Sequence, residues 1–215
     1  MSELAAMLAG ELAQPAPPAV AAMAADLARE TPHALAVLFY GSALRTGDLS
    51  GVLDFYVLTE REPRRGLKGL VNRILAPEVS YRESGEGANA LRAKIATLTL
   101  RQFRIGAHGR RADTTIWTRF AQPAALVWAR DEAAAAEARA AVALCAATAS
   151  RFAAALGPTA GQPDDYWRAL FRRTYRAELR VEAAGRENSL IDLHPGRYAA
   201  ILEPAWRAAG IAYER

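Results

Sequence analysis

The sequence predicts a mixed α/β (α+β) fold, in which a mixed sheet with flanking helices is followed by a helical C-terminal part. Two apolar runs, Ala34–Tyr40 and Val52–Leu58, are short enough to be buried strands, and a Gly-Ser turn and a polar loop separate them. Alternation of period two in Glu78–Glu83 and Leu91–Leu100 predicts a β-hairpin. From Asp131 onward the chain is alanine-rich, which favours helix.

We therefore expect two domains, 1–130 with the mixed sheet and 131–215 with helices. A chain of 215 residues suits one good-sized domain or two small ones. The formal net charge is +4 and the pI is near 9.5. This basic surplus is compatible with nucleotides, nucleic acid or acidic lipid head groups, and a solvated basic face explains it equally well.

Cysteine content and hydropathy limit the cellular compartment and the kind of membrane association to be expected. The single cysteine, Cys145, excludes an internal disulfide and a cysteine-based zinc site, and it fits a reducing cytoplasm. No stretch reaches the roughly 18–20 uninterrupted apolar residues of a membrane span. The N-terminus lacks the basic region of a signal peptide. Any membrane role is thus expected to be peripheral.

The first half of the chain contains two alanine-rich helices before the strands. Residues 3–13 and 18–30 are separated by a proline-rich break, and Pro32 blocks continuation of the second helix. After the second strand and a charged loop, Gly66–Leu75 has the apolar face of an amphipathic helix.

The rest of the chain is predicted to be mostly helical. The expected elements are a short basic helix and loop in Arg101–Ala112, a helix in Asp113–Phe120, an apolar segment in Pro123–Ala129, long helices in Asp131–Leu156 and Asp164–Glu182, and C-terminal helices in Asn188–Glu203 and Pro204–Ala209.

Asp54 is the most informative residue of the strand pair. A carboxylate near the start of a buried strand is costly unless it is paired or bound to a cation. We therefore expect Asp54 at the mouth of the strand, facing a metal, a base or solvent. The glycine of Gly41-Ser42 lets the backbone approach a phosphate closely, and the serine can donate to a phosphate oxygen. The combination indicates a phosphate and metal site, against the simpler interpretation of a strand-end turn beside an aspartate that pairs with an arginine.

A strand, a Gly-Ser turn, a loop and a strand with an acidic residue resemble the core of the DNA polymerase beta superfamily of nucleotidyltransferases. Within it, the chain resembles the mitochondrial-type CTP:phosphatidate cytidylyltransferases, which also occur in bacteria. The matching stretches, in the family's order, are Phe39–Ser42, Leu53–Val57, Asn89–Thr99, Thr114–Leu126 and Tyr175–Glu182. Lys94, Glu178 and Arg180 fall on a lysine, an acidic residue and an arginine of the family.

The resemblance implies a nucleotidyltransferase-like sheet and Mg²⁺-dependent transfer of CMP from CTP to phosphatidate, which gives CDP-diacylglycerol and pyrophosphate for phospholipid biosynthesis. Asp54 and Lys94 would be catalytic, and Gly41, Ser42, Arg45 and Lys94 would bind the nucleotide. Magnesium requires oxygen ligands, which carboxylates and phosphates supply. The setting implied is cytoplasmic, with peripheral contact at the inner face of an anionic membrane, for which Arg101–Arg111 is the basic candidate.

The chain departs from this family's pattern at the metal site. The superfamily has two aspartates in the second strand, whereas here Val52 stands at the first of these positions and only Asp54 remains. The family's glycine after the serine is Ala43. Asp48, Glu78 or Glu83 could supply the missing carboxylate. Asp48 could equally be a turn residue, and the two glutamates could be solvated ends of a hairpin.

Other candidate residues also admit two interpretations. Lys94 is a cation in an apolar strand, where it could contact a triphosphate or extend its ammonium to water. Arg45 could bind a phosphate or be a solvated loop residue. The three histidines, His33, His108 and His194, have no metal-binding spacing.

Three function classes remain in competition with the cytidylyltransferase. A nucleotidyltransferase acting on another acceptor keeps the same site. A catalytically degenerate module that binds nucleotide or lipid would explain the missing aspartate at Val52. A nucleic-acid-binding module is disfavoured, because the basic residues are dispersed along the chain instead of lying on one recognition helix.

Overall fold

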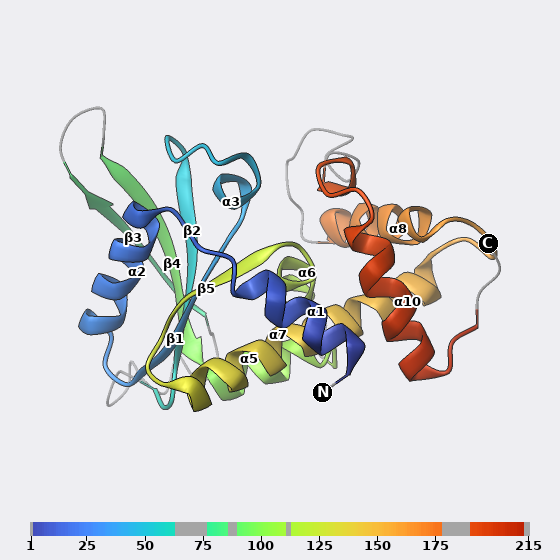
Figure 1. Cartoon of the computed structure of the whole chain (residues 1–215), viewed down its shortest axis with the longest axis horizontal. Helices are drawn as coiled ribbons and strands as arrows, with labels where there is room; N and C mark the ends of the chain where they lie inside the picture. The colour runs from blue at the N-terminus through green and yellow to red at the C-terminus, as the bar shows by residue number, and fades with distance from the viewer. Residues whose placement is uncertain (1, 63–76, 86–89, 111–112, 178–189, 213–215) are drawn as a thin grey trace. The chain divides into compact units, whose positions relative to one another are not determined.

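The computed structural model describes residues 2–62, 77–85, 90–110, 113–177 and 190–212 (Figure 1). The protein has the predicted mixed α/β fold, with a five-stranded mixed sheet flanked by helices. In chain order the elements are α1 (Glu3–Leu12), α2 (Pro18–Glu30), β1 (Ala34–Tyr40), α3 (Ser42–Thr46), β2 (Val52–Thr59), β3 (Glu78–Ser84), β4 (Leu91–Thr99), α5 (Leu100–Ala107), α6 (Thr115–Phe120), β5 (Ala124–Ala129), α7 (Glu132–Leu156), α8 (Pro163–Ala177) and α10 (Arg197–Ala209).

The chain forms two compact units that are interleaved along the sequence. The helical unit comprises Met1–Met7, Gly106–Gln122 and Val142–Arg215, and the sheet unit comprises Leu8–Ile105 and Pro123–Ala141. Helices α1, α5 and α7 each contribute residues to both units. The assignment of separate roles to 1–130 and 131–215 stays a prediction.

The sheet has the strand order β3-β4-β2-β1-β5. Strand β1 is antiparallel to both β2 and β5, β3 is antiparallel to β4, and β2 is parallel to β4. The predicted strand pair and the predicted hairpin are therefore confirmed. The parallel pairing of β2 with β4 joins them into one sheet.

One face of the sheet forms a core with α2. The apolar side of α2, including Val20, Met23 and Leu27, packs in the same cluster as Val37 and Phe39 of β1. Further strand residues of this cluster are Leu53, Phe55, Val57, Ala93 and Ile95. All of β1 except its last residue is buried, which explains why its sequence is a continuous apolar run without alternation.

The opposite face of the sheet carries Tyr56, which is fully buried and lies edge-on to Phe103 of α5, with ring centroids 6.1 Å apart. Arg104 of α5 pairs with Glu137 of α7 at 3.6 Å, and both side chains are partly exposed. Because exposed ion pairs contribute little to the free energy of unfolding, the packing of apolar side chains is the main stabilising interaction on this face of the sheet.

Helix α7 is the single helix of the described chain that is long and apolar enough to cross a membrane, judged by length and composition. Core helices of soluble proteins meet the same criterion, and several of its alanines, including Ala138, Ala146 and Ala153, are buried within the protein. Cys145 is fully buried in this helix, and burial raises the pKa of its thiol.

The helical unit has an aromatic core. Trp167 of α8 lies against Phe171 and Tyr198, with ring centroids 5.7 and 5.2 Å apart, and its indole N–H donates to the Tyr198 carbonyl at 2.9 Å. Trp206 of α10 donates its indole N–H to the Ser150 carbonyl at 2.7 Å. The buried polar edges of both tryptophans are thus satisfied, as a well-packed core requires.

Several expectations differ from the structure. The polar loop expected after the Gly-Ser turn contains the short helix α3, and the helix expected in Asn188–Glu203 is interrupted at 193–196, before α10 begins. The apolar segment Pro123–Ala129 contains an edge strand, β5, where the sequence indicated no specific element. The break expected at Pro204 does not occur, because Pro204 lies inside the continuous helix α10. Tyr198, Ile201 and Trp206, buried on both sides of the proline, hold this helix by packing, which offsets the hydrogen bond that proline cannot donate.

Several expected features lie outside the described residues. These are the helix in Gly66–Leu75, most of the turn at 84–89, and Glu178 and Arg180 with the end of the helix that carries them.

Removal of the Phe39 side chain should destabilise the sheet unit. Phe39 is fully buried and contacts Phe55, with ring centroids 5.2 Å apart. We expect Phe39→Ala to lower the free energy of unfolding by about 3–5 kcal/mol through lost burial and a cavity. Urea denaturation followed by circular dichroism measures this loss. Phe39→Leu, which retains most of the volume, should cost clearly less, and equal losses for the two variants would contradict the proposed packing.

Candidate functional site

The turn after β1 places glycine where no other residue fits well. Gly41 has φ +97° and ψ −162°, a conformation that L-residues rarely adopt. It precedes the short helix α3, which ends at Thr46 and is capped by Gly47, whose φ is +74°. The Gly47 N–H donates to the Ala43 carbonyl at 2.9 Å, which closes the helix.

Gly41 also lies directly against the carboxylate of Asp54. A Cβ atom built on Gly41 would stand 2.6 Å from Asp54 Oδ2 and 3.4 Å from Asp54 Cβ and Cγ. Two independent constraints, the backbone conformation and this close approach, thus require glycine here. The predicted association of the Gly-Ser turn with Asp54 is a physical contact.

The sheet sets Asp54 in a row of polar side chains. Tyr40 of β1 pairs with Asp54, Asp54 pairs with Lys94 of β4, and Lys94 pairs with Tyr81 of β3. Residues paired across strands point to the same face, and neighbouring strands lie about 4.8 Å apart. We call these four residues the Asp54 row. Tyr40, Asp54 and Lys94 are half-buried, whereas Tyr81 is 73% exposed.

Lys94 is therefore the neighbour of Asp54 on the parallel strand. At a separation of about 5 Å between their Cα atoms, the ammonium and the carboxylate occupy one patch of the sheet surface. Lys94 keeps the position that the sequence predicted, a cation within an apolar strand, and the fold adds its juxtaposition with Asp54.

The candidate phosphate-binding residues lie next to this row. Ser42 is exposed at the first position of α3, and its carbonyl accepts a hydrogen bond from the Thr46 hydroxyl at 3.0 Å. Arg45 is half-buried on the same helix. The turn thus brings Gly41, Ser42 and Arg45 to the end of β1 at which Asp54 lies.

Asp48 forms a turn within the loop between α3 and β2. The Ser50 N–H donates to Asp48 Oδ1 at 2.9 Å, and the Asp48 N–H donates to the Thr46 hydroxyl at 3.2 Å. Hydrogen bonds from Ser50, the backbone N–H foremost, hold the pKa of Asp48 below its usual value. Asp48 is exposed and has the local bonding of a turn residue, and its role as a metal ligand stays a prediction.

The two glutamates lie on opposite faces of β3. Glu78 pairs with Thr97, which places it on the face away from Asp54. Glu83 pairs with Arg92 and is on the Asp54 face, but it is two strands away and offset by two residues. Those offsets separate the Cα atoms of Glu83 and Asp54 by roughly 12 Å. The sheet does not bring Glu83 or Glu78 next to Asp54.

Among the described residues, no group of three or more His, Cys, Asp or Glu side chains is arranged to hold a metal ion. Asp54 can supply one carboxylate. Magnesium is commonly bound by one or two carboxylates together with substrate phosphates and water, so a single half-buried aspartate beside a tight glycine turn fits this ion.

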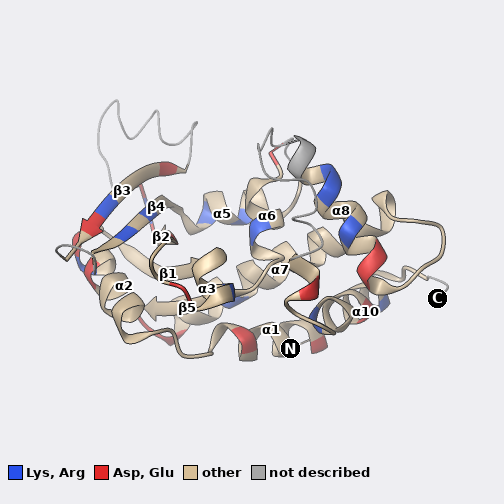
Figure 2. Cartoon of the chain, turned by 90° about the horizontal axis from the view of Figure 1, so that it is seen from above, with Lys and Arg blue, Asp and Glu red and all other residues tan. Residues whose placement is uncertain are grey.

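Basic residues lie on several elements of the described chain. They lie on α5, α6 and α8 and on strands β3 and β4 (Figure 2).

Sequence reasoning did not connect Tyr40 and Tyr81 with the site. Tyr81 was visible as a period-two residue of the hairpin, yet its place beside Lys94 depends on the register of β3 against β4. Tyr40 precedes Gly41, and its ring lies edge-on to Tyr56 at 5.5 Å. The position of Tyr40 directly before the Gly-Ser turn is the sequence feature that could have connected it with the site.

No known protein-family model matches the chain, and no curated protein matches it either.

Replacement of Gly41 tests the contact with Asp54. We expect Gly41→Ala to lower the free energy of unfolding by about 1–3 kcal/mol, because it adds both backbone strain and a clash. Gly47→Ala is the matched control, since it has a positive φ but nothing within 4 Å of the new Cβ. Thermal and urea unfolding of both variants should show the larger loss for Gly41. Asp54→Ala introduced together with Gly41→Ala should recover part of that loss, and an unchanged loss would contradict the contact.

The hydrogen bonds of Asp48 predict a pH dependence. Because the pKa of Asp48 is lowered on folding from its ordinary value of 3.8, the carboxylate stabilises the fold above that value, and this stabilisation disappears as pH falls through the lower folded value. We therefore expect the difference in free energy of unfolding between the wild type and Asp48→Asn to be constant near neutral pH. It should shrink below about pH 4. Urea titrations from pH 2.5 to 7 measure it, and a difference that grows on acidification would refute this role.

Proposed function

We propose that the protein is a nucleotidyltransferase that moves CMP from CTP to phosphatidate. The observation that carries the proposal is the contact of the Gly41 backbone with the Asp54 carboxylate, in a row that also contains Lys94. A tight glycine turn, a carboxylate and a cation are the groups that a triphosphate and its metal ion need. The choice of CTP and phosphatidate rests on the resemblance to the CTP:phosphatidate cytidylyltransferases.

The chemistry assigned to the chain is a displacement at phosphorus. A phosphate oxygen of phosphatidate attacks the α-phosphorus of CTP, the bond to the β-phosphate oxygen breaks, and CDP-diacylglycerol and pyrophosphate form. Such a reaction needs positioning and charge stabilisation more than a general base, because the nucleophile is already an anion.

Each residue of the site has a role in this proposal. The backbone at Gly41 and Ser42 holds the triphosphate, and Arg45 and Lys94 offset its negative charge. Asp54 binds Mg²⁺, which when bound neutralises charge on the transferring group. The setting proposed is the cytoplasm, at the inner face of an anionic membrane.

A second candidate, a module that binds nucleotide or lipid without turnover, is favoured by the surroundings of Asp54. The neighbour of Asp54 on β4 is the cation Lys94, where a second carboxylate could otherwise share a metal. Val52, two residues before Asp54 and on the same face, is 41% exposed and contributes no ligand. This arrangement supports phosphate binding but gives the metal a single carboxylate.

Turnover separates the two candidates. With CTP, Mg²⁺ and vesicles that contain phosphatidate, the full chain should release pyrophosphate, and Asp54→Asn should lower the rate on the order of a hundredfold or more. Glu132→Gln, at an exposed acid of α7, is the control and should behave like the wild type. A panel of nucleotides and acceptors in the same assay tests transfer to another acceptor.

A gain-of-function variant sharpens this test. Val52→Asp places a second carboxylate on the same strand and face as Asp54, so it should increase the rate or lower the Mg²⁺ concentration required. Calorimetry that detects CTP binding, with no pyrophosphate from the wild type or from Val52→Asp, would replace the enzyme proposal with the binding module.

A further inference from the structure

Exposed apolar side chains gather on the face of the sheet that carries the Asp54 row. Among the described residues, the exposed large hydrophobic side chains are Val52, Val79, Tyr81 and Leu193. Tyr81 belongs to the row, and Val52 and Val79 are each two residues from a member of it, so all three lie on this one face. Single exposed apolar residues are common on protein surfaces, whereas a group beside a candidate site indicates a contact surface for a ligand.

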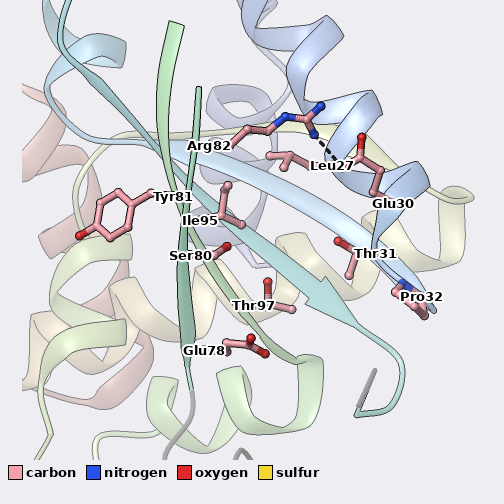
Figure 3. Close-up of a pocket in the computed structure, with 10 residues that line it drawn as sticks. All are labelled: Leu27, Glu30, Thr31, Pro32, Glu78, Ser80, Tyr81, Arg82, Ile95 and Thr97. Carbon is pink, nitrogen blue, oxygen red and sulfur yellow. Dashed lines mark hydrogen bonds and ion pairs between the residues drawn. The ribbon is translucent and has the colours of Figure 1, made fainter. Parts of the chain in front are cut away.

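Tyr81 is the most exposed member of this group, at 73%. It is one of the residues that line a cavity of about 580 Å³ on the other face of the sheet, but its ring points away from that cavity (Figure 3). Within the described chain the ring has no aromatic partner, and the hydroxyl has no hydrogen bond. Packing within the sheet unit thus does not account for this aromatic side chain.

Lys94 connects Tyr81 with the Asp54 end of the row. It pairs with Asp54 on one side and with Tyr81 on the other. Among the described residues Lys94 has no ion pair or hydrogen bond, so its ammonium can contact a bound phosphate. Because neighbouring strands lie about 4.8 Å apart, the Cα atoms of Tyr81 and Asp54 are roughly 10 Å apart. The row therefore fits an elongated ligand that is anionic at one end and aromatic at the other.

We propose that Tyr81 forms the nucleobase subsite of the site, in which the base of the nucleotide stacks on the exposed phenol ring. This inference rests on the proposed nucleotidyltransferase function. With the triphosphate at Gly41 and Asp54, the ribose crosses β4 beside Lys94 and the base reaches the edge strand β3. Stacking is open to every base, so Tyr81 supplies affinity and orientation instead of a choice among bases.

Two probes separate contacts of the base from contacts of the phosphates. Calorimetry of the full chain with Mg²⁺ compares CTP with inorganic tripolyphosphate, which has no base. We expect Tyr81→Ala to weaken CTP binding about tenfold or more and to leave tripolyphosphate binding unchanged. Ser80→Ala is the matched control, since Ser80 is the next residue on the opposite face of β3, and it should bind both probes like the wild type.

Two further variants distinguish stacking from apolar contact. Tyr81→Phe keeps the ring and should bind CTP like the wild type, whereas Tyr81→Leu keeps apolar surface without a ring and should bind as weakly as Tyr81→Ala. Equal CTP affinities of the phenylalanine and leucine variants would overturn stacking. On the wild type itself, NMR should show nuclear Overhauser contacts between the base protons of bound CTP and a labelled tyrosine ring, and their absence would overturn the subsite even where a variant fails to fold.

The outcomes distinguish this subsite from the function on which it rests. If the wild type binds both probes and Tyr81→Ala binds CTP equally well, the subsite is wrong and the proposed function stands. If the wild type binds neither CTP nor tripolyphosphate, the proposed function fails together with the subsite. An equal loss of both probes in Tyr81→Ala would overturn the assignment of Tyr81 to the base.

Discussion

The antiparallel register of β1 and β2 is the constraint on which the rest of the sheet unit depends. It sets Tyr40 opposite Asp54, so the chain must turn at Gly41 directly beside the carboxylate. It also places Phe39 against Phe55 in the core shared with α2. Because a shift by one residue would exchange the two faces, the register that buries the Phe39–Phe55 pair also places the Asp54 row on the opposite face. Stability and the candidate site therefore have one structural origin.

The polar row has an unusual balance of charge for a metal site. Its two charged residues, Asp54 and Lys94, are direct cross-strand neighbours. One carboxylate beside one ammonium favours an anionic ligand that brings its own cation. A nucleoside triphosphate with Mg²⁺ meets that description, and so does a phosphate head group. The arrangement accounts for both the catalytic and the binding proposals, and it locates their difference at position 52, where valine stands.

The local sequence pattern predicted most helices and strands, whereas contacts between segments distant in the sequence could be found only from the three-dimensional structure. Continuous apolar runs gave β1 and β2, and Pro32 correctly ended α2. The alternation of β3 already implied that Glu78 and Glu83, five residues apart, face opposite sides. The edge strand β5 was missed because a short, alanine-rich apolar segment fits a helix or a strand equally well. The contact of Gly41 with Asp54 and the pairing of Asp54 with Lys94 depend on registers that no local pattern encodes.

The burial of Cys145 has a chemical consequence. A thiol reacts as its thiolate, and burial both raises the pKa of this group and denies reagents access to it. Its rate of alkylation is therefore governed by how often the surrounding helices open, and not by the intrinsic reactivity of cysteine. The alkylation rate of this single cysteine therefore reports the frequency of local unfolding around the middle of α7.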